Sequence, residues 1–108
     1  MSSYLFIESR DPYESNEVAA QYDLAAGLAR DGATVTVFLV QNGVLAARKG
    51  EKAELVTKLA QAGVEVLADE FSLRERAIAP GRLVAGVKPA PIETVVDQLE
   101  QGRKALWH

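Results

Sequence analysis

The segment that most constrains the fold is residues 35–50, where an apolar run changes abruptly into a turn and then into helix-compatible residues. Every residue from 35 to 40 is apolar or β-branched, which is typical of a strand buried on both faces of a sheet. Asn42-Gly43 follows as a turn signal, and residues 44–47 are compatible with a helix. A strand of this kind, opening onto a loop and a helix start, indicates a parallel sheet.

The rest of the chain alternates short apolar runs with helical patterns. Besides the strand at 34–40, strands are predicted at 4–7, 64–67, 83–85 and 105–107. Helices are predicted from Asp11-Pro12 or Ser15 to Gly32, at 51–62, at 71–78, and from Pro91 to Gly102. This alternation predicts βαβ crossovers, and therefore a single three-layer α/β/α domain over residues 1–108 with a mostly parallel sheet of about five strands.

Three of the predicted helices carry an apolar face that should pack on the sheet. In the first helix it consists of Val18, Tyr22, Ala25 and Ala29, with Leu24 and Leu28 beside them. In the second it consists of Leu55, Val56, Leu59 and Ala60, and in the last of Ile92, Val95, Val96 and Leu99.

Charge and hydropathy narrow the classes of partner. The net charge of −3 argues against nucleic acid, because no cluster of Lys and Arg in the sequence builds a positive field. The densest basic groups, Arg48-Lys49 with Lys52 and Arg103-Lys104, are interpreted as solvated helix faces. No segment approaches the ~20 apolar residues of a membrane span, and the first residues do not form a signal peptide. The expected location is the cytoplasm.

The sequence contains no cysteine. Disulfides, thiolate metal sites and persulfide carriers are therefore excluded together. Nothing in the sequence indicates a cofactor, since it has neither a Walker-type phosphate loop nor a GxGxxG motif after a strand.

In an open parallel sheet, ligands bind beyond the carboxyl ends of the strands. The predicted loops at that edge are 8–15, 41–43, 68–70 and 86–91. They supply the candidate ligand-binding residues Arg10, Asp11, Gln41, Asn42, Gly43 and Asp69.

Each candidate also has a structural explanation. Asn42-Gly43 either presents N–H groups to an anion or simply forms a turn with a positive φ, and Asp11 either binds a ligand or caps a helix. Asp69 and Glu70 either hold a metal or place charge at a helix start, and without a nearby histidine we expect no metal site. We expect no catalytic residue, because Ser72 lacks an activating histidine and the only one in the sequence is His108.

Residues 44–47 are more apolar than a solvated loop requires, which suggests a subunit interface. Val44 and Leu45 are candidate interface residues. Trp107 is a third, because an exposed tryptophan usually packs on a sheet or into a contact between subunits. We therefore expect a homo-oligomer.

Several segments together resemble the DsrE/DsrF/DsrH family of small sulfur-relay proteins. They are residues 35–50, 64–69, 70–78, 83–99 and 105–107. Within 70–78, Ala77 lies where glycine is usual, and residues 105–107 are similar to the C-terminal strand of the DsrH/TusB branch. The resemblance implies compact homo- or hetero-oligomers and a sulfur-relay protein as partner. It also implies a reactive cysteine just after the third strand, where this chain has Asp69.

The sequence thus favours a non-catalytic, cysteine-free DsrE-like protein that serves as an oligomeric binding or accessory module linked to sulfur metabolism. The alternative is a small-molecule or anion-binding protein, an enzyme included, that uses the loops at the carboxyl ends of the strands.

Overall fold

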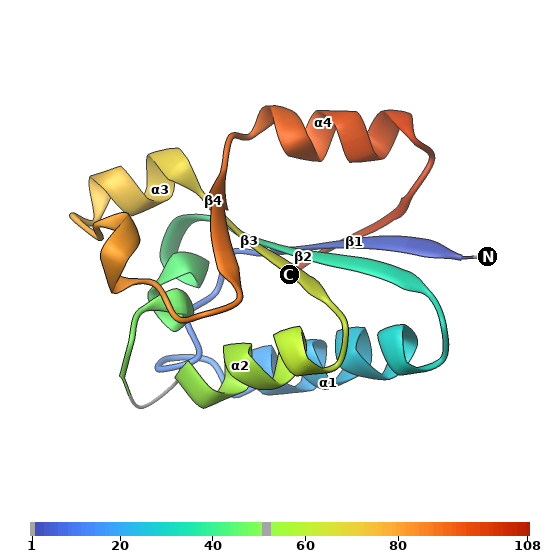
Figure 1. Ribbon diagram of the computed structural model, residues 1–108, viewed down its shortest axis with the longest axis horizontal. Helices are drawn as coiled ribbons and strands as arrows, with labels where there is room; N and C mark the ends of the chain where they lie inside the picture. Colours follow the sequence, from blue (N-terminus) through green and yellow to red (C-terminus); the bar gives the residue numbers. More distant parts are fainter. Residues whose placement is uncertain (1, 51–52) are drawn as a thin grey trace.

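The computed structural model describes residues 2–50 and 53–108. In this part of the chain, five parallel strands form one sheet in the order β4-β3-β2-β1-β5 (Figure 1). The strands are β1 (Ser3–Glu8), β2 (Thr34–Leu39), β3 (Glu65–Asp69), β4 (Val87–Ala90) and β5 (Lys104–Trp107). The predicted α/β fold with a five-stranded parallel sheet is confirmed.

Helices cover both faces of this sheet. The helices are α1 (Glu17–Arg30), α2 (Ala53–Gln61), α3 (Glu70–Glu75) and α4 (Glu93–Glu100), with 3-10 helices η1 (Gln41–Ala47) and η2 (Pro80–Arg82). Figure 1 shows α1 and α2 on one side of the sheet and α3 and α4 on the other, which gives three layers. No helix in the described ranges combines the length and the apolar character needed to cross a membrane.

Strand β2 is buried on both faces, as its unbroken apolar sequence predicts. Val37 and Leu39 belong to the larger core under α1 and α2, together with Val56 and Leu59 of α2. Phe38, from the opposite face of β2, belongs to a smaller core that also contains Leu5, Ile7, Val40, Leu67, Ala90 and Val95.

Helix α1 begins later than the sequence predicts. Asn16 occupies the cap position, and neither Asp11 nor Ser15 does. The side chain of Asp11 instead accepts a hydrogen bond from the backbone N–H of Tyr13 at 2.9 Å, and its carbonyl accepts those of Glu14 and Ser15. Because Asp-Pro suits the start of a turn as well as the start of a helix, the sequence does not separate the two outcomes.

The prediction of a strand at residues 83–85 was wrong. The backbone N–H of Val84 bonds to the carbonyl of Ala47 at 2.8 Å, and Leu83 forms an isolated antiparallel bridge with Arg48. The actual strand β4 contains Pro89, a residue that is tolerated because β4 lies at the edge of the sheet.

Of the four apolar residues of the last helix predicted to face inward, only Val95 does so. Val95 and Gln98 face inward, whereas Ile92, Val96 and Leu99 are 51%, 50% and 46% exposed. On α1, Leu24 is likewise exposed rather than packed. Below α4, Gln98 Nε2 meets Glu65 at 3.4 Å, and Thr36 also donates to Glu65, so part of the surface under this helix is polar.

Gly43 lies within η1 rather than in a turn with a positive φ. The positive φ in this segment belongs to Gln41, at 51°. Glycine is required at position 43 because a Cβ there would overlap the backbone carbonyl oxygen of Glu8. The exit of β2 is therefore packed directly against the end of β1.

Replacing Gly43 with alanine should destabilise the fold by about 2 kcal/mol or more, since the added methyl meets backbone that cannot rotate away. Gly27→Ala is the matched control, because its Cβ would have nothing within 4 Å and the position is helical. The control should stabilise the protein by about 0.5–1 kcal/mol. Urea unfolding of both variants tests this, and equal effects would contradict the proposed contact.

Candidate functional site

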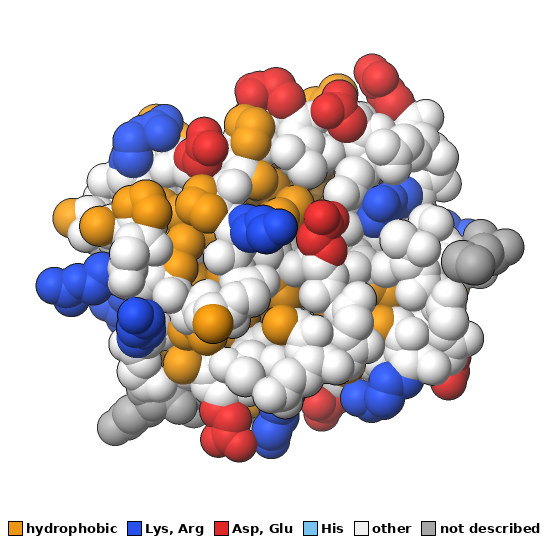
Figure 2. All heavy atoms as spheres, viewed as in Figure 1, with side chains coloured by type: hydrophobic (Ala, Val, Ile, Leu, Met, Phe, Trp, Pro, Cys, Tyr) orange, Lys and Arg blue, Asp and Glu red, His pale blue; other side chains and the backbone are white. Residues whose placement is uncertain are grey.

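A cleft of about 290 Å³ opens at the carboxyl edge of the sheet, between α3 and α4. It is lined by Ile7, Val40, Gln41, Asp69, Phe71, Ser72, Glu75, Ile92, Val95 and Trp107. Figure 2 shows hydrophobic side chains gathered on the face between α3 and α4. The walls are mostly apolar, and the polar groups come from the loop after β2 and from the start of α3.

Asp69 lies at the end of β3 and is only 7% exposed. Its Oδ2 accepts hydrogen bonds from the backbone N–H of Ser72 at 3.0 Å and from the Ser72 hydroxyl at 2.7 Å. The carboxylate thereby caps α3, where the partial positive charge of the helix start also favours it. Asp69 serves to hold this helix in place.

The Ser72 hydroxyl both donates and accepts a hydrogen bond. It donates to Asp69 and accepts the backbone N–H of Gln41 at 2.8 Å. The bond from Gln41 ties η1 to α3 across the floor of the cleft. Among the described residues, no group of three or more His, Asp or Glu side chains is placed to hold a metal ion.

The structure brings together two of the six predicted ligand-binding residues, Gln41 and Asp69. Asn42 turns away and accepts hydrogen bonds from Arg76 Nε at 3.2 Å and Nη2 at 3.0 Å. Gly43 is buried. Arg10 and Asp11 do not line the cleft either.

Sequence reasoning missed the apolar walls, which are Phe71, Ile92 and Val95. No signal in the sequence distinguishes such residues from core residues, because both are apolar at helical spacing. The distinction depends on how far each helix lies from the sheet.

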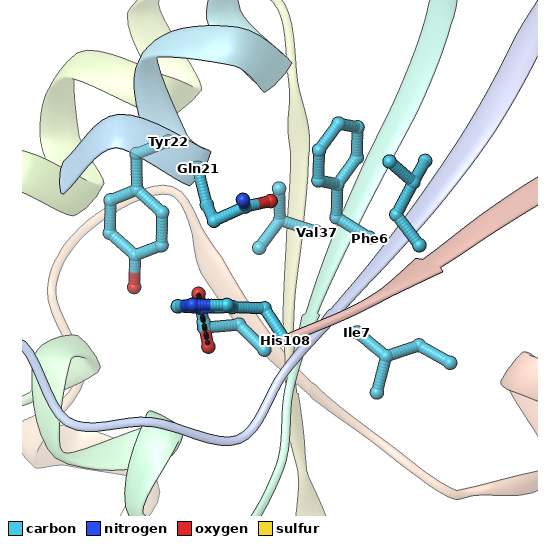
Figure 3. Close-up of a pocket in the computed structure, with 8 residues that line it drawn as sticks. Phe6, Ile7, Gln21, Tyr22, Val37 and His108 are labelled. Atoms are coloured by element: carbon cyan, nitrogen blue, oxygen red, sulfur yellow. Dashed lines mark hydrogen bonds and ion pairs between the residues drawn. The ribbon is translucent and has the colours of Figure 1, made fainter. Parts of the chain in front are cut away.

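A second polar cluster lies at the end of β1. The buried carboxylate of Glu8 contacts His108 Nδ1 at 2.9 and 3.0 Å and accepts the backbone N–H of Arg10 at 3.1 Å. His108 Nε2 lies 3.2 Å from a carboxylate oxygen of Glu17 on α1. In Figure 3, Tyr22 and Gln21 reach from α1 toward His108. The adjoining cavity measures about 10 Å³, room for about one water and not for a substrate.

These contacts change the acidity of two groups. The hydrogen bond that His108 makes to Glu8 raises the pKa of His108 above its ordinary 6.5; burial opposes this shift, and the contact with Glu17 adds to it. Burial raises the pKa of the Tyr22 phenol, and the charges of Glu8 and Asp11 raise it further, so the phenol stays neutral. The cluster therefore ties β5 to β1 and α1 through the His108 imidazole, whose protonated form the two carboxylates favour.

The tie should weaken as the pH rises. Because the folded state raises the pKa of His108 above 6.5, its contribution to stability is complete below about pH 6.5 and is lost as the pH rises through the folded pKa. The wild type should thus lose its advantage over His108→Gln as the pH rises above about 6.5. Urea midpoints across this range test it, and an advantage that grows with pH would reject the assignment.

The fold and the position of the cleft define the class of protein. A parallel sheet with α1 and α2 on one face, α3 and α4 on the other, and a cleft beyond β3 is a DsrE-like α/β domain. The chain belongs to the DsrE/DsrF-like family, whose sequence pattern matches residues 2–107. The resemblance noted in the sequence is confirmed.

Solved structures show the same fold. The ychN protein from E. coli superposes with a TM-score of 0.91 at 19% identity, and the match covers 100% of both chains. A protein of unknown function from Methanobacterium thermoautotrophicum, MTH1491, gives 0.85 at 20% identity and 100% coverage of both chains. BT1422 from Bacteroides thetaiotaomicron, also of unknown function, gives 0.85 at 15% identity, covering 99% of this chain and 95% of that one. A search of the curated proteins finds no match.

Proposed function

We propose that this chain is a non-catalytic DsrE-like protein that acts in the cytoplasm as an oligomeric binding or accessory module of sulfur metabolism. The observation that carries the proposal is the cleft at the end of β3, which has apolar walls and a capping carboxylate at its floor. Family membership supports the link to sulfur relay.

Asp69 supports a binding role without sulfur transfer. In sulfur-carrying members of the family the reactive cysteine lies just after the third strand, and we take Asp69 as the matching position in this chain. A carboxylate cannot hold a persulfide, because that requires a polarizable thiolate. The Asp69 carboxylate also accepts two hydrogen bonds from Ser72, so it is occupied with holding α3.

The surroundings of the cleft favour a protein as its partner. Phe71 and Trp107, which border it, are 59% and 68% exposed. From the same cleft, Ile92, Val96 and Leu99 continue along α4 at the spacing i, i+4, i+7, which forms one stripe. We call these five residues the α4 patch. Contiguous exposed apolar surface of this kind typically marks an interaction site.

The α4 patch is the interface that we propose for a homo-oligomer. Trp107 stays in the proposed interface. Val44 is fully buried in the core of its own chain, and Leu45 is half-buried against that core, so the apolar residues 44–47 need no partner to explain them. The implied tendency of DsrE-like proteins to assemble agrees with this proposal.

The protein should take up no sulfane sulfur. After incubation with polysulfide, intact mass spectrometry should show no stable gain of a sulfur atom, because no thiol is present. Asp69→Cys is the matched variant: it should gain sulfur, at the expense of about 1 kcal/mol of stability from the lost cap. Sulfur on the unmodified chain would refute non-catalytic status, and an inert Asp69→Cys variant would refute the assignment of this position.

The protein should be an oligomer that Leu99→Glu dissociates, because the substitution would bury an unpaired charge at the contact. Leu24→Glu is the control, since Leu24 is also 46% exposed but lies on α1, in the opposite layer. Sedimentation equilibrium at micromolar concentration distinguishes them. A monomeric wild type would reject assembly, while dissociation by both variants would reject only the α4 patch.

The alternative function, small-molecule binding in the same cleft, is favoured by its size, which is near the lower end of ordinary ligand sites. Native mass spectrometry of the purified protein would then reveal a copurifying ligand, whereas the binding-module proposal expects only protein.

A further inference from the structure

We propose that a second site, outside the cleft, binds a small molecule carrying two linked phosphate groups. The site is a hollow of about 410 Å³ whose described lining includes Arg48, Lys49, Arg76 and Arg82, with Tyr13 and Ile78. We call it the basic hollow. It does not depend on the function proposed for the cleft, with which it shares no lining residue.

The cations converge because two distant turns are joined through their backbones. The N–H of Lys49 donates to the carbonyl of Arg82 at 3.1 Å. The adjacent bonds of this junction, the Val84–Ala47 hydrogen bond and the Arg48–Leu83 bridge, fix the same two segments side by side. Arg48 and Lys49 therefore lie in a turn and not on the solvated helix face that the sequence suggested.

Arg76 brings a third, oriented cation to the hollow. Its guanidinium donates to Asn42 Oδ1 through Nε and Nη2, and to the carbonyl of Ser72 through Nη1 at 3.2 Å. These contacts use three of its five N–H donors and leave the others available. A guanidinium held this way loses little conformational freedom when it binds an anion.

The charges of the basic hollow are not balanced by its described surroundings. None of the described lining residues is acidic. The ion pairs found among the described residues involve Arg10, Lys58 and His108, and none includes a cation of the hollow. Four like charges gathered on a chain of net charge −3 repel one another, and a multivalent anion would relieve that repulsion.

The volume of the basic hollow and the side chains that line it indicate which class of ligand it binds. Arginine forks match the oxygens of phosphate groups, and four cations suit an anion with several charges better than a single phosphate. The volume fits a small molecule. Tyr13 and Ile78 add an aromatic ring and an aliphatic wall that can cover an organic group attached to the phosphates.

Isothermal titration of the full chain with inorganic pyrophosphate, inorganic phosphate and a nucleoside diphosphate tests the proposal. Pyrophosphate should bind at least about 10-fold more tightly than phosphate, with an affinity that falls as salt is added. Tighter binding of the nucleoside diphosphate would assign the organic group to Tyr13 and Ile78, and equal binding would assign recognition to the phosphates alone. Both results support the site.

Arg82→Gln and Lys49→Gln should each weaken pyrophosphate binding by about 10-fold. Both side chains are exposed, so thermal unfolding should be unchanged and loss of binding cannot be ascribed to misfolding. Arg30→Gln removes the same charge from the exposed end of α1 and should leave the affinity unaltered. Absence of pyrophosphate binding by the wild type, or an equal loss in Arg30→Gln, would overturn the proposal.

Discussion

The close approach of Gly43 to Glu8 is the constraint on which the carboxyl edge of the sheet depends. The carbonyl of Glu8 accepts the N–H of Val40 and leaves no room for a side chain at position 43, so η1 must start against β1. The carboxylate of the same residue holds His108 at the end of β5. From η1, the N–H of Gln41 reaches the Ser72 hydroxyl, which in turn bonds to Asp69. The ends of β1, β2, β3 and β5 are thereby joined through one set of short contacts.

This junction separates two surfaces of opposite character. On one side, Gln41 and Ser72 form part of the apolar cleft below α4. On the other side, Asn42 and the carbonyl of Ser72 orient Arg76 toward the basic hollow. Adjacent residues of η1 thus face different sites.

The sequence predicts the elements whose stability is local or whose burial is complete. Strand β2 is buried on both faces, and the glycines at 32 and 63 end their helices with φ values of 99° and 94°. Prediction from the sequence fails where tertiary contacts decide which residues form a strand or face the core. Strand β4 was not predicted because it contains Lys88-Pro89, and a proline is tolerated in a strand only at the edge of a sheet. Ile92, Val96 and Leu99 were predicted to face inward because periodicity does not reveal which stripe of a helix faces the sheet. Gln41 and Asp69 were predicted because the carboxyl-edge rule is topological. The basic hollow was not, because backbone contacts between residues 47–49 and 82–84 bring three of its cations together, and the fourth, Arg76, is held by Asn42 and the Ser72 carbonyl.

Ala77 shows how one unfavourable backbone position can be retained. Its φ of 54° lies in the left-handed region, which costs an alanine about 1 kcal/mol relative to a helical conformation and agrees with the glycine that the family resemblance implies there. The turn is nevertheless fixed from both sides. The N–H of Ile78 bonds to the carbonyl of Leu73 at 2.9 Å, and the Ile78 side chain is buried. Ending α3 at this point keeps Arg76 in reach of both Asn42 and the Ser72 carbonyl. The packing of Ile78 therefore offsets the strain, and the same turn positions the Arg76 guanidinium for the basic hollow.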